Sequence, residues 1–193
     1  DLGHWVLNEV CLQIKKWNSL EMDFGYISIN ISPFEFQQAN FVTNLSDAIT
    51  KNDVLPSSLY VEITESMLLS NINDIAEKMN ELKKLCFRFS IDDFGTGYSS
   101  LAYLKQLPLD TLKIDRSFVC DITDDPNDAA IVESTLAMSS RMGFRVIAEG
   151  VETQEQLEFL KEHQCDFCQG YFYSPPISAK EFEIMLKHNK QVC

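Results

Sequence analysis

Hydrophobic and polar positions along the chain follow two periods, one typical of strands and one typical of helices. Short runs rich in β-branched and aromatic residues lie at residues 24–31, 59–64, 87–92, 111–115, 145–149 and 167–173. Between these runs apolar residues recur every three or four positions, as they do over residues 72–82. The pattern predicts an α/β protein in which six strands alternate with helices, and such alternation predicts a parallel sheet.

Signals for helix ends support this alternation. Capping boxes, in which a hydroxyl residue stands three positions before Glu or Gln, begin at Ser32, Thr153 and Ser178. Pro126 is suited to the first turn of a helix, and Gly143 is suited to the end of the same helix. Apolar residues at helical spacing over residues 7–17 predict that the chain opens with a helix.

The two faces of the predicted strands favour a barrel. In residues 59–64, Val61 and Ile63 alternate with polar residues such as Glu62. Strands of an open sheet that is covered on both sides tend instead to be apolar on both faces. We therefore expect a TIM-like (β/α) barrel, which in full has eight strands and about 250 residues. Because the chain has 193 residues and about six predicted strands, we expect an incomplete barrel whose first strands are missing.

Length and charge restrict the classes of function. A chain of 193 residues, 45% of them hydrophobic, is expected to fold as one domain over residues 1–193. Its 16 basic and 29 acidic residues give a net charge of −13, which argues against binding DNA or RNA polymers. No apolar run approaches the ~20 residues that span a bilayer, and residues 1–11 lack the pattern of a signal peptide. We expect a cytoplasmic domain, although its parent protein can be membrane-anchored.

The six cysteines follow no repeating framework, which predicts reduced thiols. His163, Cys165 and Cys168 lie close together in the sequence and suggest a zinc site. A structural zinc site needs four ligands, however, and the sequence offers no second pair of ligands at the required spacing. The sequence therefore favours free thiols over a zinc site.

Polar side chains stand at the C-terminal ends of the predicted strands. They are Asn30, Glu62 with Glu65, Asp92 with Asp93, Lys113 with Asp115, Glu149 with Glu152, and Gln169. In a parallel barrel these ends meet at one rim, where active sites form. Any one of these acids could be a solvated residue or a helix cap, but so many acids in one rim would repel one another without cations. The pattern predicts one or two hard divalent cations and, through them, a phosphate-containing ligand.

Two features of this rim leave alternatives open. Asp92 and Asp93 are adjacent, and successive strand residues point to opposite faces. They can serve one site only if the strand breaks there, which the glycines of residues 95–97 permit. Lys113 stands among the acids, where it either acts on a nucleophile or on developing charge, or forms a buried ion pair with Asp92 or Asp115.

Five motifs together resemble those of EAL domains, which are bacterial phosphodiesterases that hydrolyse the second messenger cyclic di-GMP. They are Val61–Ser66 (VEITES), Asp92–Leu101 (DDFGTGYSSL), Leu112–Asp115 (LKID), Ala148–Glu152 (AEGVE) and Gln169–Tyr171 (QGY). Residues 5–11 and 29–33 also fit, so the resemblance covers essentially the whole chain. The fold of that family is a modified (β/α)8 barrel, which agrees with the strand and helix alternation.

The resemblance implies a role for each rim residue. The ligands of two Mg²⁺ or Mn²⁺ ions would be Asn30, Glu62, Asp92, Asp93 and Glu149. Lys113 would orient the nucleophile, and Glu149 would accept a proton if an acceptor is needed besides the metals. Gln169 would hydrogen-bond a metal-bound water, and Ser32 and Pro33 would also contact substrate or water. Glu65 would brace the loop of residues 93–100, which the family also uses near its dimer contacts.

The implied reaction is attack of a metal-bound hydroxide on one phosphodiester of cyclic di-GMP, which gives linear pGpG. The Glu-Ala-Leu signature of the family, with its metal-binding Glu and a nearby Arg, would lie upstream of Asp1. We therefore expect an N-terminally truncated EAL domain that hydrolyses cyclic di-GMP poorly or not at all by itself. The alternatives are a non-catalytic cyclic di-GMP receptor or regulatory interaction domain and, less consistent with the motifs, an unrelated metal-dependent barrel enzyme. A homodimer and a flanking GGDEF or sensory domain are further expectations.

Overall fold

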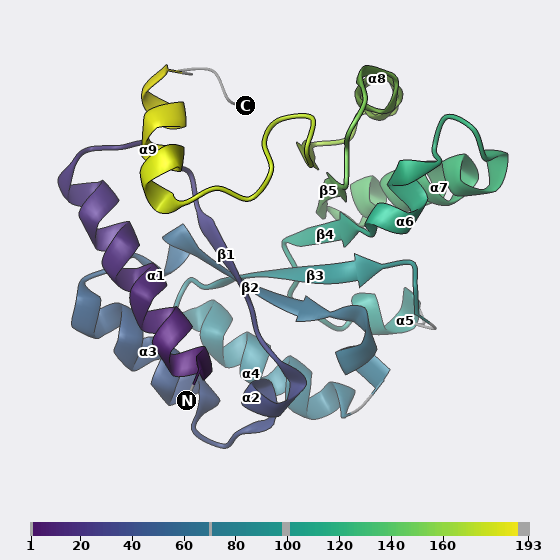
Figure 1. Cartoon of the computed structure of the whole chain (residues 1–193). Coiled ribbons are helices and arrows are strands. Elements are labelled where there is room, and N and C mark those ends of the chain that lie inside the picture. Colours follow the sequence, from purple (N-terminus) through teal and green to yellow (C-terminus); the bar gives the residue numbers. More distant parts are fainter. Residues whose placement is uncertain (1, 70, 98–100, 189–193) are drawn as a thin grey trace. The chain divides into compact units, whose positions relative to one another are not determined.

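The computed structural model describes residues 2–69, 71–97 and 101–188 (Figure 1). Strands and helices alternate along these residues as the sequence predicts. The described strands are β1 (Ile27–Asn30), β2 (Leu59–Thr64), β3 (Arg88–Phe94), β4 (Thr111–Ile114), β5 (Arg145–Glu149) and β6 (Phe167–Gln169). Their order in the sheet follows the chain, and the pairings in β1–β2 and from β3 to β6 are parallel.

Helices stand before β1, in each connection between the described strands, and after β6. The α-helices are α1 (Leu2–Ser19), α2 (Pro33–Gln37), α3 (Phe41–Asn52), α4 (Ile72–Lys84), α5 (Leu101–Leu104), α6 (Arg116–Cys120), α7 (Pro126–Met142), α8 (Gln154–Glu162) and α9 (Ala179–His188). Two short 3-10 helices, η1 and η2, cover Pro56–Ser58 and Glu65–Leu69. None of the helices in the described part of the chain combines the length and the apolar character that a bilayer crossing requires.

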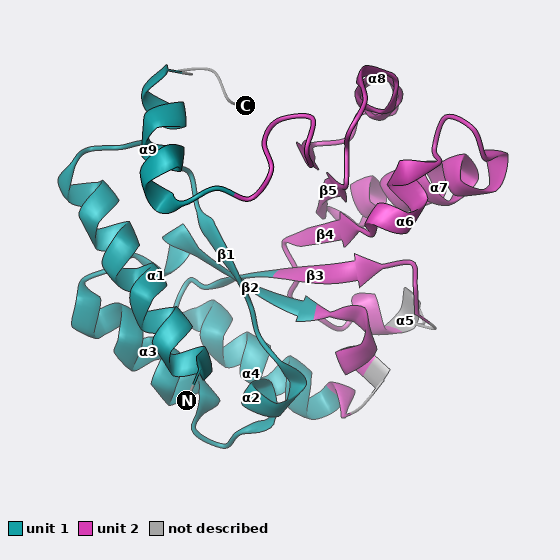
Figure 2. Cartoon of the chain, viewed as in Figure 1, with its two compact units in different colours: residues 1–63, 73–89, 177–193 teal, residues 64–72, 90–176 magenta. Residues whose placement is uncertain are grey.

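The chain divides into two compact units (Figure 2). Unit 1 contains residues 1–63, 73–89 and 177–193, and unit 2 contains residues 64–72 and 90–176. Each unit has its own buried side chains and its own strand pairings.

Unit 1 contains the parallel pair of strands β1 and β2. The α1 helix contacts both β1 and α3. One face of α1 is buried through residues three or four positions apart, namely Leu7, Cys11, Ile14 and Trp17. The α3 helix contacts α1 and buries Phe41, Leu45 and Ile49 at the same spacing. The register of the strands pairs Asn30 with Glu62, so these two polar residues are neighbours at the ends of their strands.

Unit 2 contains most of β3 together with β4, β5 and β6. The register pairs Lys113 with Ile147, Ala148 with Cys168, and Glu149 with Gln169. The α7 helix contacts β4 and β5 and buries Val132 and Leu136. Because β4 and the middle of β5 are buried, the polar residues at the ends of these strands are held on a packed support.

The predicted helix ends are confirmed. Ser32 and Thr153 form complete capping boxes at the starts of α2 and α8, and Ser178 exchanges the same two kinds of hydrogen bond with Glu181. Gly143 ends α7 in the left-handed conformation with φ +78°. Glycine adopts that conformation without the steric cost that a Cβ would bring.

Two strands are shorter than the sequence predicts. The run 24–31 forms a strand only from Ile27, because Gly25 has φ +70° and interrupts the extended backbone. The run 167–173 ends as a strand at Gln169. Beyond it, the backbone N–H groups of Tyr173 and Ser174 donate to the carbonyl of Gly170, so the chain turns. The aromatic residues after Gln169 therefore led to the prediction of a strand that is longer than the observed one.

Candidate metal centre

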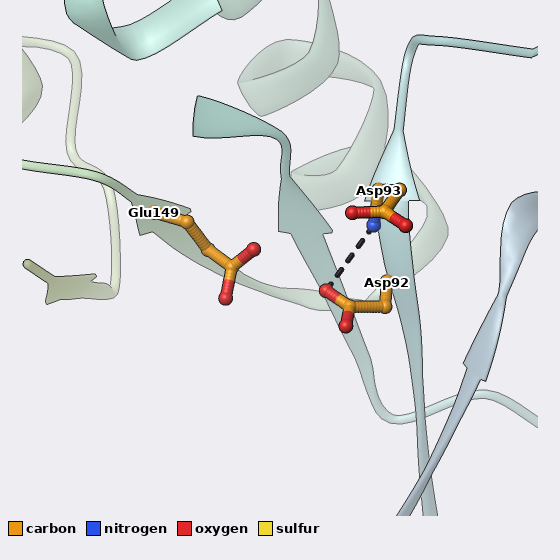
Figure 3. A group of neighbouring side chains, drawn as sticks. All are labelled: Asp92, Asp93 and Glu149. Carbon is orange, nitrogen blue, oxygen red and sulfur yellow. Dashed lines mark hydrogen bonds between the residues drawn. The ribbon is translucent and has the colours of Figure 1, made fainter. Parts of the chain in front are cut away.

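Three carboxylates of unit 2 meet at the ends of β3 and β5 (Figure 3). One carboxylate oxygen from each of Asp92, Asp93 and Glu149 lies within 4.8 Å of the others. Among the described residues this is the one group of three His, Cys, Asp or Glu side chains with such spacing. We call Asp92, Asp93 and Glu149 the carboxylate triad. The triad contains three of the five metal ligands that the sequence predicts.

The two adjacent aspartates can join one group because the extended backbone of β3 is interrupted at Asp93. The register of β3 with β4 shifts between Ile91 and Phe94, and Asp93 has φ +55°. Aspartate is among the few non-glycine residues that adopt this left-handed conformation readily. The break that the sequence requires at the two aspartates therefore lies at Asp93 itself, and the glycines of residues 95–97 follow it. The Asp93 N–H donates to Asp92 Oδ1 at 3.2 Å, as the dashed line in Figure 3 shows.

Lys113 joins two members of the triad. Its Nζ lies 3.0 Å from Asp92 Oδ1 and 2.7 Å from Glu149 Oε1, and the residue is only 4% exposed. The alternative of a buried ion pair is thus realised with Asp92, while Glu149 is a partner that the sequence did not suggest. A single ammonium cannot balance three ionised carboxylates, so the group keeps an excess of negative charge that favours a further cation.

The raised pKa of Asp93 also indicates a site that favours a cation. Partial burial raises the pKa of the Asp93 carboxyl group, and the neighbouring Asp92 and Asp115 raise it further, while Lys113 lowers it. Crowded carboxylates disfavour one another's ionised forms. A divalent cation bound by the triad would oppose that repulsion, so the donor set fits a metal ion.

Glu65 supports the segment that follows the aspartates. The residue is 3% exposed, and its Oε2 accepts hydrogen bonds from the backbone N–H groups of Gly95 (2.9 Å) and Gly97 (3.2 Å). A Cβ on Gly97 would lie 2.9 Å from Glu65 Oε1, so only glycine fits at that position without movement of its neighbour. These contacts agree with the predicted bracing of the loop, although Tyr98, Ser99 and Ser100 lie outside the described residues.

Asp115 is a neighbour of Asp93, and both Asp115 and Glu152 also have partners outside the triad. Asp115 caps α6 by accepting from the Ser117 N–H at 2.8 Å. Glu152 forms an ion pair with Arg116 at 3.0 Å. Gln169 is exposed at the end of β6 and pairs in register with Glu149. Of these residues, Gln169 alone lies beside a triad residue by strand pairing, as its predicted contact with a water in the site requires.

Gln156 is a positioning residue that sequence reasoning missed. Its Oε1 accepts from the N–H groups of Glu152 (2.7 Å) and Thr153 (3.0 Å), and its Nε2 donates to the Cys120 carbonyl at 2.9 Å. These bonds hold the turn that follows Glu149. The capping box at Thr153 was a signal for one of them, but nothing in the sequence indicated the contact with Cys120.

The predicted site residues of unit 1 lie on β1, β2 and α2. Asn30 is exposed and Glu62 is 4% exposed, and the two are strand partners. The Ile31 N–H donates to the Glu62 carbonyl at 2.9 Å. Ser32 is engaged in the cap of α2, and Pro33 is the first residue of that helix, so their predicted contact with substrate or water stays a prediction.

The chemistry of the triad fits hard divalent cations. Carboxylate oxygens are the ligands that Mg²⁺ and Mn²⁺ prefer, and parallel β/α folds carry such sites at the C-terminal ends of their strands. The fold and the triad together define a metal-dependent α/β protein of the barrel type. More particularly, the chain belongs to the EAL domain family, whose model matches residues 1–176.

Curated relatives agree with this family. The chain is 42% identical over 183 residues to the signaling protein YkoW of Bacillus subtilis strain 168, a match that covers 95% of this chain and 23% of YkoW. It is 38% identical over 184 residues to the bifunctional diguanylate cyclase/cyclic di-GMP phosphodiesterase MucR of Pseudomonas aeruginosa, with coverage of 93% and 26%. The chain therefore spans about a quarter of the length of these relatives.

Solved structures show the same fold. The PaMucR phosphodiesterase in complex with c-di-GMP superposes with a TM-score of 0.90 at 38% identity, over 94% of this chain and 73% of that one. The EAL domain of Mycobacterium smegmatis DcpA gives 0.92 at 35% identity, with coverage of 97% and 85%. A manganese/cy-diGMP complex of Klebsiella pneumoniae BlrP1 gives 0.78 at 27% identity, with coverage of 90% and 45%. These likenesses confirm the predicted TIM-like (β/α) fold.

Proposed function

We propose that this EAL domain binds divalent cations through the carboxylate triad and hydrolyses cyclic di-GMP to linear pGpG. The observation that carries the proposal is the convergence of Asp92, Asp93 and Glu149 around the buried ammonium of Lys113. The names of MucR and of the solved PaMucR phosphodiesterase complex support the substrate, because both describe cyclic di-GMP phosphodiesterases.

Three residues of unit 2 have different roles in the proposed reaction. Lys113 fixes the side chains of Asp92 and Glu149 and directs positive charge at the place where negative charge develops on the phosphodiester. Glu149, whose Oε1 lies 2.7 Å from Lys113 Nζ, accepts the proton that the nucleophile loses. Glu65 keeps the turn after Asp93 in place through Gly95 and Gly97.

Mg²⁺ or Mn²⁺ is the proposed cation. When bound, such an ion polarises a phosphoryl oxygen and lowers the pKa of water. The manganese complex of BlrP1 supports this choice. On the resemblance of their motifs, Asn30 and Glu62 are proposed as further ligands. On the same basis, Gln169, Ser32 and Pro33 are proposed to contact water or substrate.

We propose that residues 1–193 act as one EAL domain of a longer protein. The chain covers only about a quarter of YkoW and of MucR, which supports the presence of neighbouring domains. The name of MucR includes a diguanylate cyclase activity, so a GGDEF domain is a good candidate for one of them. A cytoplasmic location suits a nucleotide second messenger. Homodimer formation, which the resemblance implies for the loop after Asp93, belongs to the same proposal.

The test is the conversion of cyclic di-GMP to pGpG, followed by liquid chromatography in the presence of Mg²⁺ or Mn²⁺. The full-length protein that contains this domain is expected to form pGpG, and in it Asp92→Asn and Glu149→Gln are expected to lose at least about a hundredfold in rate. Asp124→Asn, an exposed aspartate outside the triad, is the matched control. If the protein binds cyclic di-GMP but forms no pGpG with either metal, the receptor alternative replaces the proposal.

A further inference from the structure

Cys165 and Cys168 form a C-x-x-C pair at the start of β6 that the proposed reaction does not use. Both residues are half-buried and free of a disulfide, and each thiol shifts the pKa of the other. Cys165 Sγ lies 3.2 Å from the carbonyl oxygen of Phe167, the residue next to Cys168. Two partly exposed thiols at this spacing form a site of potential chemistry.

The backbone holds this pair together from both ends. The Cys165 N–H donates to the Leu160 carbonyl at 2.9 Å, and the Asp166 carboxylate accepts from the Val146 N–H of β5 at 2.8 Å. At the other end, Cys168 pairs with Ala148 in the β5–β6 ladder. The backbone positions of the two cysteines are therefore set by the fold.

The pKa values of the two thiols are shifted in opposite directions. The hydrogen bond from Cys165 lowers the pKa of the Cys168 thiol, burial opposes this, and the nearby Lys161 lowers it further. The same hydrogen bond, together with burial, raises the pKa of Cys165. Because the thiolate is the nucleophile in thiol chemistry, Cys168 is the thiol that reacts first and Cys165 is the one that resolves the product.

We propose that Cys165 and Cys168 are an oxidation site that closes to an intrachain disulfide in the presence of a hydroperoxide. The Cys168 thiolate attacks one oxygen of hydrogen peroxide and becomes a sulfenic acid, while the leaving hydroxide takes up a proton and departs as water. The Cys165 sulfur then attacks the sulfenic sulfur, the S–S bond forms, and a second water leaves. Two thiols lose two electrons in total, and one peroxide is reduced to two waters.

The disulfide would act on the strand that carries Gln169. Closing the bond requires the two sulfurs to approach to ~2.05 Å and releases Cys165 from its contact with the Phe167 carbonyl. Movement of Cys168 passes to Gln169, whose carbonyl accepts from the Val151 N–H at 3.1 Å. The backbone at Gly170 has little room to take up this movement, because it packs so closely against Val151 that an added Cβ would lie 2.1 Å from the Val151 carbonyl oxygen. Val151 follows Glu149 by two residues, so oxidation disturbs the support of the triad.

The direct test is peptide mapping by mass spectrometry after treatment with hydrogen peroxide and alkylation of the remaining thiols. A linked Cys165–Cys168 peptide that is two hydrogens lighter, and that dithiothreitol restores, is the expected result. Cys168→Ser and Cys165→Ala must each abolish the linked peptide, while Cys86→Ser, which removes an exposed thiol elsewhere, must leave it. Thermal unfolding of each variant shows whether the fold is kept.

Three results would overturn the proposal. In the first, both thiols remain open to alkylation after oxidation. In the second, each forms a separate sulfinic acid. In the third, stoichiometric zinc binds the pair and protects it from peroxide.

A second readout rests on the proposed function. In the oxidised wild type, hydrolysis of cyclic di-GMP is expected to fall at least about tenfold, the loss typical of a disturbed outer support of a metal site. The same treatment is expected to leave the rate of Cys168→Ser unchanged. If oxidation links the cysteines but no form of the protein hydrolyses cyclic di-GMP, the proposed function fails and the oxidation site stands. If the linked protein keeps its full rate, the coupling to the triad is wrong.

Discussion

At the scale of single residues, Lys113 determines how three carboxylates can be held close together. Its ammonium bridges Asp92 and Glu149 in a nearly buried position, where an unpaired charge of either sign is costly. The spacing of polar residues along the strands was enough to select Lys113 and the triad as candidates. It could not reveal that Lys113 contacts Glu149, because that contact depends on the register of two strands that are distant in the sequence.

Replacing Lys113 with alanine removes the only bridge described between Asp92 and Glu149. Two poorly hydrated carboxylates then face each other, so the free energy of unfolding without metal is expected to fall by about 3 kcal/mol. Hydrolysis of cyclic di-GMP is expected to fall by about 10²–10³ in rate, because positive charge is lost where negative charge develops. Urea denaturation and a rate assay measure the two effects.

The control for this variant is Lys105→Ala, which removes an exposed lysine of the same unit and is expected to change neither quantity. A Lys113→Ala protein that keeps both its stability and its rate would mean that the bridge between Asp92 and Glu149 is unimportant.

At the scale of elements, helix ends were easier to predict than strand ends. A capping box is a local signal, and Ser32 and Thr153 form the predicted bonds. The break in β3 is not local, because it is a mismatch with the partner strand β4 that places Asp93 in a left-handed conformation. Gly95 and Gly97 indicated that a break was near, but only the pairing of the strands shows its position.

Gln156, in the first turn of α8, is expected to stabilise the segment that joins β5 to α8. In Gln156→Ala the N–H groups of Glu152 and Thr153 lose their acceptor, and the Cys120 carbonyl loses its donor. Buried polar groups left without partners are costly, so the free energy of unfolding is expected to fall by about 2 kcal/mol.

Gln154→Ala removes a neighbouring glutamine whose bond to Glu158 is exposed, and chemical denaturation should find it close to wild type. Equal stability of the two variants would show that the turn does not need the bonds of Gln156.

The α9 helix of unit 1 offers a prediction about pH. Glu183 accepts hydrogen bonds from Lys16 (2.7 Å), Trp17 (3.0 Å) and Gln13 (3.4 Å) of α1. The bonds from Lys16 and Trp17 lower the pKa of Glu183 below its ordinary value of 4.5. A carboxyl group with a lowered folded-state pKa stabilises the protein above its unfolded-state pKa, and this contribution is lost as the pH falls through the folded-state pKa.

The stability of wild type is therefore expected to drop more steeply than that of Glu183→Gln as the pH falls below 4.5, the pH at which an ordinary carboxyl group of this type is half protonated. Tryptophan fluorescence during denaturation follows this directly, because Trp17 is one of the donors. Glu9→Gln, on the exposed side of α1, should keep the wild-type slope. Parallel pH profiles for wild type and Glu183→Gln would contradict the role of Glu183.

At the scale of the whole chain, the alternation of strands and helices and the spacing of the motifs predicted both the fold class and the family. Both are repeated signals, so an error at one strand end does not change the result. Single contacts were beyond the reach of the sequence where they join distant segments, as Gln156 and Cys120 do. The cysteines Cys165 and Cys168 were visible close together in the sequence, but no sequence signal marked the bend at Asp166 that lies between them.

The central claim is that the carboxylate triad holds a divalent cation. Titration of the protein with Mn²⁺, followed by isothermal calorimetry and by the electron paramagnetic resonance of the free ion, tests it without any assumption about the substrate. Saturable binding is expected for wild type, with at least about tenfold weaker binding for Asp92→Asn and for Glu149→Gln and unchanged binding for Asp124→Asn. Equal Mn²⁺ affinity in all four proteins, or no binding by wild type, would contradict the account.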